Sequence, residues 1–258
     1  MIEPGACIHR NGPAMIRGMY NAATALDAAM QHQEIVADNL AHLATPGHRA
    51  RGVSFESLQS TLGPQAKSSH GSALNSAGVR TAGIYTNFQP GAMRPTGDPY
   101  HFAIEGDGFF ALEGPNGTVY SRNGTFHVNA DGQLLSSSNY PVLGTSGPIT
   151  IPSDARRVTM ARDGTIYADS AQVGQLQVTR FADNSRLEQV GPTLYRSTPE
   201  AGESTGDASV MQGFLETSNT NAASSMVEMI QAARFFETAQ RALRSIAETL
   251  QLNTRPTA

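Results

Sequence analysis

Two groups of residues in this sequence carry side chains of the kinds used in catalysis or metal binding: seven histidines and two carboxylates beside glycines. The histidines are scattered, and none forms an HExxH motif or another close ligand pair at helical spacing. The sequence therefore predicts no metal site and no cofactor. His32 and His42 fall outside the helical seams described below, which favours solvated helix surface over metal ligation.

The carboxylates Glu105 and Asp107 lie in the run Glu105-Gly106-Asp107-Gly108. Such a pair raises the alternatives of a glycosidase acid and base or a calcium loop. An EF-hand needs alternating acidic positions and a distant Glu, whereas a glycosidase pair normally comes from different strands. A tight turn before a strand is the favoured interpretation. The G-x-S-x-G, P-loop and dinucleotide-binding motifs are also missing, so the sequence predicts no catalytic residues.

Composition narrows the classes of partner. The 22 acidic and 18 basic residues give a formal net charge of −4, which argues against nucleic acid or an anionic membrane as partner. No apolar run approaches the roughly 20 residues that cross a bilayer. The single cysteine, Cys7, excludes a disulfide within the chain. Residues 1–14 lack the apolar core of a Sec signal peptide and are expected to be a disordered extension, with Met15 as an alternative start.

Near both ends of the chain, apolar residues recur alternately three and four positions apart, as in a heptad seam on a helix. This spacing predicts one helix over residues 15–45, stopped by Pro46, and another over residues 218–255. The helices can pair within one chain or pack with other subunits. One glutamine interrupts each seam, either fixing its register or lying at its exposed edge. The seam residues are Ile16, Met19, Ala23, Leu26, Met30, Gln33, Ala37, Leu40, Ala222, Met226, Met229, Ala233, Phe236, Gln240, Leu243, Ala247 and Leu250.

Between these helices the periodicity falls to two, as in strands. Four turn dipeptides predict hairpins: Asn116-Gly117, Asn123-Gly124, Asp131-Gly132 and Asp163-Gly164. The fold class is therefore α+β, with a mainly β domain at residues 98–200 inserted between the helices. Residues 46–97 are expected to be a linker, and residues 201–217 a linker with a short strand. The expected strands are Phe109 to Glu113, Thr118 to Arg122, Thr125 to Asn129, Gln133 to Leu135, Ile149 to Ile151, Val158 to Ala161, Thr165 to Ala168 and Gln175 to Phe181.

Several motifs occur in a fixed order along nearly the whole chain. They are Met15 to Tyr20, Asp38 to Ala41, Thr45 to Gly47, Ala103 to Phe110, Tyr120 to Phe126, Asp131 to Leu134, Gln212 to Asn221, Met226 to Ile230 and Arg234 to Glu237. In this order they resemble the signatures of bacterial flagellar rod and hook proteins. His42 and His48 stand where that family usually has Asn and an aromatic residue, and Ala233 stands where Gln is usual.

The resemblance implies a structural subunit of the periplasmic flagellar rod. Its seam residues would form the assembly interface with other copies and with neighbouring rod and hook subunits, and the rod would transmit motor torque to the hook. It also implies secretion by the flagellar type III export apparatus. Chain length favours a rod subunit over the hook. Three segments resemble the proximal rod more closely than the distal rod, although the distal rod stays open: Pro46-Gly47, Pro141 to Gly144 and Gly147 to Ile149. A secreted glycan-active enzyme and a monomeric coiled-coil adaptor are the alternatives.

Overall fold

The computed structural model describes residues 12–59, 76–205 and 209–254. These residues form two compact units. The helical unit comprises the described parts of Met1–Asp38, Arg51–Tyr85 and Ala223–Ala258, and the β unit comprises Asn39–Ala50 and Thr86–Ala222. Each unit is therefore assembled from segments that are far apart in the sequence.

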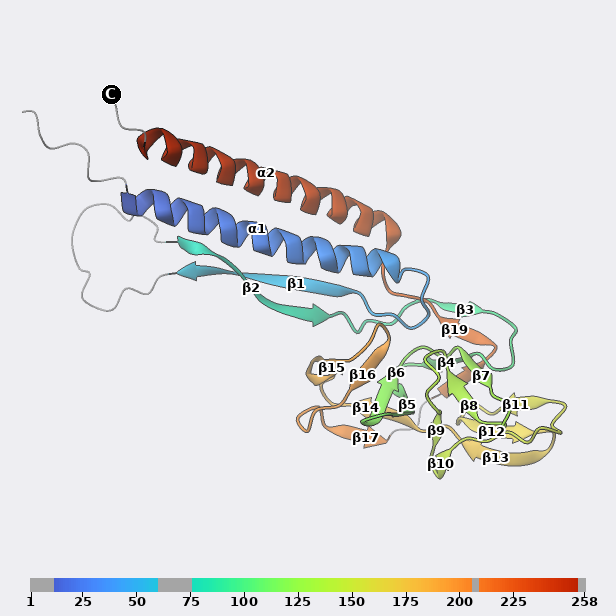
Figure 1. The fold of residues 1–258 in the computed structure, drawn as a ribbon. Coiled ribbons are helices and arrows are strands. Elements are labelled where there is room, and N and C mark those ends of the chain that lie inside the picture. Colours follow the sequence, from blue (N-terminus) through green and yellow to red (C-terminus); the bar gives the residue numbers. More distant parts are fainter. Residues whose placement is uncertain (1–11, 60–75, 206–208, 255–258) are drawn as a thin grey trace, which may run out of the picture. The chain divides into compact units, whose positions relative to one another are not determined.

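The helical unit contains the two long helices of the chain. Helix α1 (Gly12–Ala41) and helix α2 (Ala222–Thr254) lie side by side and run in opposite directions (Figure 1). A Cβ atom placed on Gly18 of α1 would lie 3.6 Å from Cδ1 of Ile246 of α2. Both helices thus pack within one chain. Neither of them is long and apolar enough to cross a membrane, and no other helix in the described residues is.

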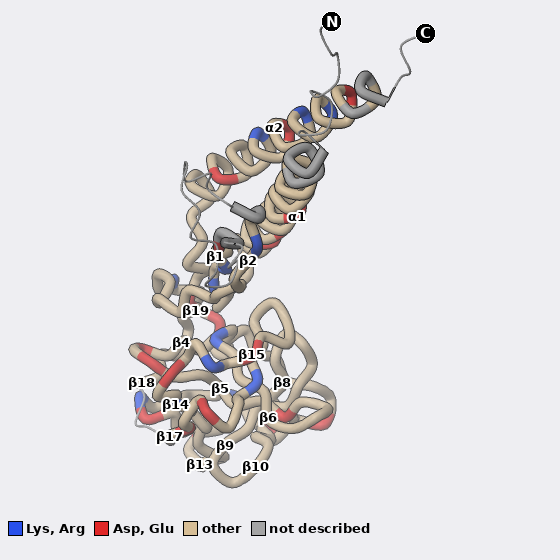
Figure 2. Tube along the Cα trace, turned by 90° about the vertical axis from the view of Figure 1, so that its left-hand side faces the viewer, with Lys and Arg blue, Asp and Glu red and all other residues tan. Residues whose placement is uncertain are grey.

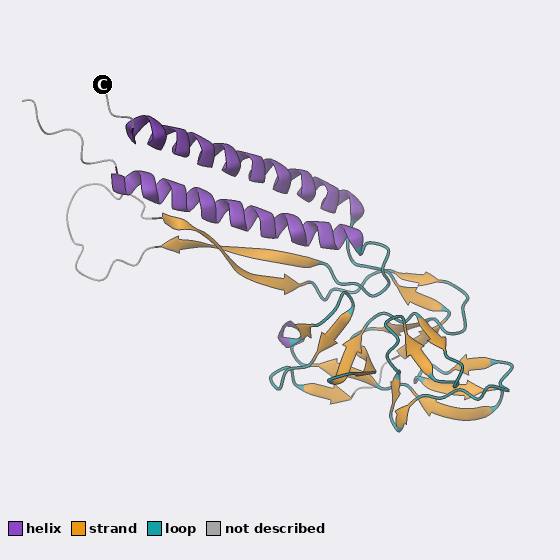
Figure 3. Ribbon diagram, viewed as in Figure 1, coloured by secondary structure: helices purple, strands orange, loops and turns teal. Residues whose placement is uncertain are grey.

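On its other side, α1 faces a two-stranded sheet of β1 (Arg51–Gln59) and β2 (Ser76–Thr86) (Figure 3). The rings of His32 and Phe55 meet edge to face at 5.8 Å, and the amide of Val79 donates to Oγ1 of Thr24. Since the helix is covered on two sides, small and branched residues dominate its buried positions: Ala22, Ala28, Ala29, Ile35 and Val36.

The β unit is built from short strands. Its largest sheet has six strands in the order β15-β16-β6-β5-β14-β17, in which every pair is antiparallel. The bounds are β3 (Met93–Pro95), β4 (Phe102–Glu105), β5 (Phe109–Gly114), β6 (Gly117–Ser121), β7 (Phe126–Val128), β8 (Leu134–Ser136), β9 (Leu143–Gly144), β10 (Gly147–Pro148), β11 (Val158–Met160), β12 (Thr165–Ala168), β13 (Ala171–Gln175), β14 (Val178–Phe181), β15 (Glu188–Gln189), β16 (Leu194–Arg196), β17 (Glu203–Thr205), β18 (Ser209–Gln212) and β19 (Phe214–Glu216).

One apolar core lies inside the β unit. The ring of Phe126 contacts those of Phe102 and Phe110, with centroids 5.8 and 5.1 Å away, and Leu112 and Leu134 are fully buried in the same cluster. A second cluster on the six-stranded sheet joins Phe109, Ala111, Tyr120 and Tyr195. Burial of these side chains supplies the main driving force for folding of this unit.

Three of the four predicted hairpin turns are confirmed. Asn116-Gly117 joins β5 to β6, Asp131-Gly132 joins β7 to β8, and Asp163-Gly164 joins β11 to β12. The glycines of these turns have φ between 79° and 111°, a range that favours glycine. The predicted turns thus set three local pairings in the β unit.

The fourth prediction, a hairpin at Asn123-Gly124, is wrong. These residues connect β6 to β7, which belong to different sheets. The side chain of Asn123 accepts a hydrogen bond from the amide of Thr125, and Gly124 is packed against the main chain of Phe102. Gly124 is thus needed for the close approach of two backbones rather than for a reversing turn.

The segments expected to be linkers contain strands. Residues 46–97 hold β1, β2 and β3, and residues 201–217 hold β17, β18 and β19. Their Ser, Gly, Ala and Thr content suggested flexibility, but β18 pairs with β4 and β19 pairs with β3. Long-range pairing therefore prevailed over local composition. Residues 1–11 and 60–75 lie outside the described residues, and α1 begins at Gly12, within the expected 1–14 extension.

We expect Gly124→Ala to lower the free energy of unfolding of the β unit by about 3 kcal/mol or more, because overpacked cores are destabilised on this scale. A Cβ atom there would lie 1.6 Å from the carbonyl oxygen of Phe102. Gly174→Ala is the control, since its nearest neighbour would be Cγ1 of Ile149 at 3.8 Å. Urea unfolding measures both variants, and equal midpoints would contradict the close approach.

Candidate assembly surface and buried ionic network

Large apolar side chains are exposed mainly on the helical unit. Of the eleven such residues in the described part of the chain, ten belong to the helical unit, and Val190 alone belongs to the β unit. Contiguous exposed apolar surface on a folded protein commonly marks a binding site for another chain. The ten residues are Met19, Tyr20, Met30, Phe55, Ile84, Tyr85, Met226, Val227, Ile230 and Phe235.

The predicted seam on α1 lies on a different face from the helix's buried positions. Met19 and Met30 are 39% and 47% exposed, and Ala23 and Ala37 are exposed as well. Leu26, Gln33 and Leu40 are half-buried, while the side chain of Ile16 lies outside the described residues. The seam of α1 is thus largely open to solvent. Its role as an assembly interface stays a prediction.

On α2, the buried positions are displaced by one residue from part of the predicted seam. Ser225, Ala232 and Ala239 are buried at intervals of seven, whereas Met226 and Gln240 are exposed. The remaining described members are half-buried: Ala222, Met229, Ala233, Phe236, Leu243 and Ala247. Leu250 lies outside the described side chains. Because residues 232 and 233 are both alanine, the periodicity of apolar residues alone could not distinguish the predicted register from the observed one.

Charged residues of both signs alternate along α2 (Figure 2). Arg234, Glu237, Arg241, Arg244 and Glu248 are all exposed, and Arg241 lies 3.5 Å from Glu237 one turn earlier. The exposed apolar residues therefore stand among balanced charges. Such a surface suits a protein partner better than a polyanion.

The β unit contains a buried ionic network centred on Glu216. Its Oε1 lies 2.6 Å from Nη1 of Arg49, and its Oε2 lies 3.2 Å from Nη1 of Arg122. All three side chains are at most 5% exposed. Buried ions need close partners of opposite charge, because desolvation opposes their charged forms. Burial lowers the pKa of Arg122 to about 10 against the opposing effect of Glu216, so this guanidinium stays charged at neutral pH.

Hydrogen bonds to the main chain complete the network. The amide of Gly91 donates to Oε1 of Glu216, and the amide of Gly47 donates to its carbonyl oxygen, each at 2.8 Å. Arg49 donates to the carbonyl oxygen of Gln89, and Arg122 donates to that of Gly106. Four chain segments therefore meet at one carboxylate.

Sequence reasoning missed this network, although two motifs contain its members. Arg122 lies within Tyr120 to Phe126, and Glu216 lies within Gln212 to Asn221. Each residue is the one charged member of an otherwise uncharged motif, and this was the available signal. Pairing them required knowledge of contacts across 94 residues.

The carboxylates of Glu105 and Asp107 form the turn that the sequence favoured. Both side chains are exposed: Glu105 is the last residue of β4, and Asp107 lies between β4 and β5, with φ values of 91° at Gly106 and 134° at Gly108. The main-chain oxygens of this turn accept hydrogen bonds from arginines: that of Gly106 from Arg122, and that of Asp107 from Arg180. The turn thus serves the packing of the β unit.

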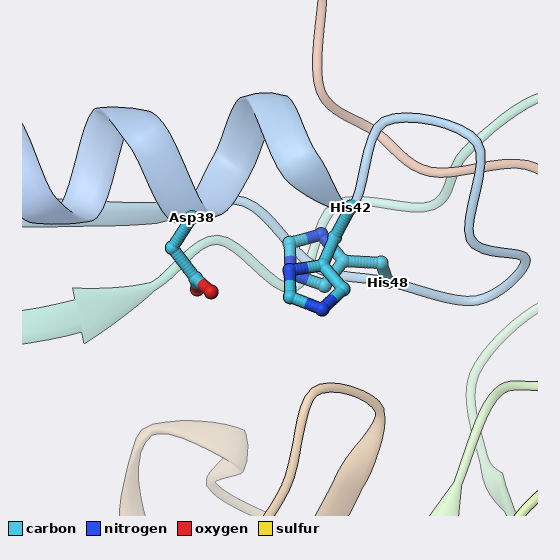
Figure 4. A group of neighbouring side chains, drawn as sticks. All are labelled: Asp38, His42 and His48. Atoms are coloured by element: carbon cyan, nitrogen blue, oxygen red, sulfur yellow. The ribbon is translucent and has the colours of Figure 1, made fainter.

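Two histidines that the sequence placed outside any site meet in the structure. The rings of His42 and His48 are stacked with centroids 4.9 Å apart and an interplanar angle of 13° (Figure 4). His48 is fully buried and His42 is half-buried. The Thr45-Pro46-Gly47 turn between them brings together residues that no helical or strand spacing relates.

A closed β unit and exposed apolar helices drawn from both ends of the chain define a protein suited to binding other protein chains. The family described as "Flagellar hook protein FlgE/F/G D1 domain" matches residues 103–168, and "Flagellar basal body rod FlgEFG protein C-terminal" matches residues 211–254. The first match contains Arg122, and the second contains Glu216 and nearly all of α2.

Relatives match along most of the chain. The flagellar basal-body rod protein FlgG of Buchnera aphidicola subsp. Acyrthosiphon pisum is 32% identical over 92% of this chain and 98% of its own length. FlgF of Mesorhizobium japonicum is 31% identical over 90% and 93%, and FlgG of Bacillus subtilis is 28% identical over 92% and 97%. The chain belongs to the family of flagellar basal-body rod proteins.

We expect Glu216→Gln to lower the free energy of unfolding of the β unit by about 3–5 kcal/mol, because two buried guanidinium groups lose their counter-charge. Glu200→Gln is the control, since Glu200 forms an exposed pair with Arg186 at 2.8 Å and should change stability by less than about 1 kcal/mol. Denaturant unfolding of both purified proteins measures the difference. Equal effects would show that the buried network does not hold the unit together.

Proposed function

We propose that this chain is a structural subunit of the flagellar basal-body rod, located in the periplasm, which assembles through its terminal helices and transmits motor torque to the hook. The observation that carries the proposal is the concentration of exposed apolar residues on the helical unit. The rod proteins related to this chain supply the biological setting. Copies of itself and neighbouring rod and hook subunits are the proposed partners.

Association between subunits would bury the apolar side chains that are exposed on these helices. Burying one large apolar side chain contributes about 1.5–3 kcal/mol, so several such contacts between subunits offset the entropy of association. Contacts between unlike surfaces that do not close into a ring extend into helical filaments. In the proposed rod, the helices form an inner tube and the β units form an outer layer.

The other two hypotheses differ in what they require. A glycan-active enzyme needs an acid and a base facing one substrate, whereas Glu105 and Asp107 lie in one exposed turn whose main chain binds arginines. A monomeric adaptor accounts for two helices paired within a chain, but it leaves Met226, Ile230 and Phe235 exposed without a role. The exposed surface therefore favours the rod subunit.

Met226→Asp tests the assembly surface directly. Met226 belongs to the predicted seam and is 53% exposed, so aspartate should leave the isolated fold intact while placing an unpaired charge in the contact between subunits. We expect an unchanged melting temperature, loss of assembled rods in electron micrographs of basal bodies, and loss of swimming. Gln231→Asp, also at an exposed position of α2, should retain rods and swimming. Normal rods in the Met226→Asp strain would remove this residue from the interface.

We also propose that the subunit leaves the cell through the flagellar type III export apparatus, because the chain belongs to the family of flagellar basal-body rod proteins. The full chain should be secreted by cells with a working flagellar exporter and retained by cells without one. A chain without residues 2–11, which precede α1, should be exported and assembled. Secretion of the full chain without the exporter would contradict this route.

A further inference from the structure

The stacked pair of His42 and His48 lies in a part of the β unit that the assembly proposal does not use. One ring nitrogen of each residue lies within 4.8 Å of the other (Figure 4). The rings are nearly parallel, and His48 is fully buried while His42 is half-buried. The two imidazoles thus present nitrogen ligands to one small region, one of them from a fixed position and the other from a more exposed one.

The backbone between these histidines is held in a defined conformation. The amide of Thr45 donates to the carbonyl oxygen of His42, and the amide of His48 donates to that of Thr45. Gly47 adopts φ of +69° and donates to the carbonyl oxygen of Glu216. A site with these two ligands is therefore largely preorganised before anything binds.

The chemistry of this pair favours a divalent transition metal. Imidazole nitrogen is the commonest protein ligand for zinc-like ions. The neighbouring Arg49 is paired with Glu216 at 2.6 Å, so its positive charge is compensated.

We propose that His42 and His48 bind one Zn²⁺-like ion, with water as the further ligands. Zn–N bonds of about 2.0–2.1 Å in a tetrahedral site place two nitrogens about 3.3 Å apart. Starting from at most 4.8 Å, the rings must approach by up to about 1.5 Å. Rotation of the more exposed His42 ring provides this movement. The bound ion would cross-link the chain on the two sides of the Thr45-Pro46-Gly47 turn.

The variants for the test are chosen from the burial of the two histidines. His42→Asn keeps a polar side chain at a half-buried position, and His48→Phe keeps an aromatic ring at a buried one. His127→Asn is the matched control, because His127 is exposed on β7 in the same unit.

Isothermal titration of the untagged full chain with ZnCl₂ at neutral pH measures binding. We expect one ion per chain, binding weakened more than about tenfold in His42→Asn and His48→Phe, and unchanged binding in His127→Asn. Zn²⁺ should raise the melting temperature of the wild-type chain and not that of His42→Asn. Binding should also weaken on acidification, because protons compete with the metal for its ligands.

Absence of stoichiometric binding by the wild-type chain, or equal binding by the two histidine variants, would overturn the proposal. Circular dichroism without metal identifies a variant that fails to fold. If His48→Phe does so, the half-buried His42 decides the result, because asparagine at its position removes the ligand without disturbing the core. This outcome is independent of rod assembly, which is measured in cells.

Discussion

The carboxylate of Glu216 is the point on which the β unit depends. Buried among apolar residues, this group is tolerable only because Arg49 and Arg122 face its two oxygens and the amide of Gly91 donates to one of them. These partners come from the segment after α1, from the end of β6 and from the segment before β3. One carboxylate thus fixes the relative positions of three chain segments. Hydrophobic burial is not directional, so it would not by itself specify this arrangement.

The two units divide the physical requirements of a rod protein between them. The β unit closes its core on itself and leaves one large apolar residue exposed among those described, so it offers little apolar surface to another chain. The helical unit buries small residues, such as Ala29 and Ala232, and leaves methionines and aromatic residues exposed. Bulky flexible side chains such as Met226 adapt to a neighbouring subunit with little change in the helix that carries them.

The sequence revealed the elements whose signals are local. Two helices, the hairpins at Gly117, Gly132 and Gly164, and the turn at Gly106 follow from periodicity and glycine placement within a few residues. Pairings across the chain did not follow, since β18 with β4 and Arg122 with Glu216 join residues about a hundred positions apart. The sequence also did not predict which face of α1 and of α2 is buried. Adjacent apolar residues such as Ala232 and Ala233 are compatible with two heptad registers. Composition misled at β2, where Val79 and Ile84 lie among small residues.

The late position of Glu216 in the chain has a consequence for synthesis. Arg49 must wait for a partner made 167 residues later, since 216 − 49 = 167. Likewise β4 remains an open edge until β18 emerges. At about 5–20 residues per second, that interval is on the order of 10–30 s on the ribosome. The β unit therefore has no complete native state while most of its length is being made. A nascent chain that stays incompletely folded for so long is available to holding factors and to any machinery that accepts only extended polypeptide.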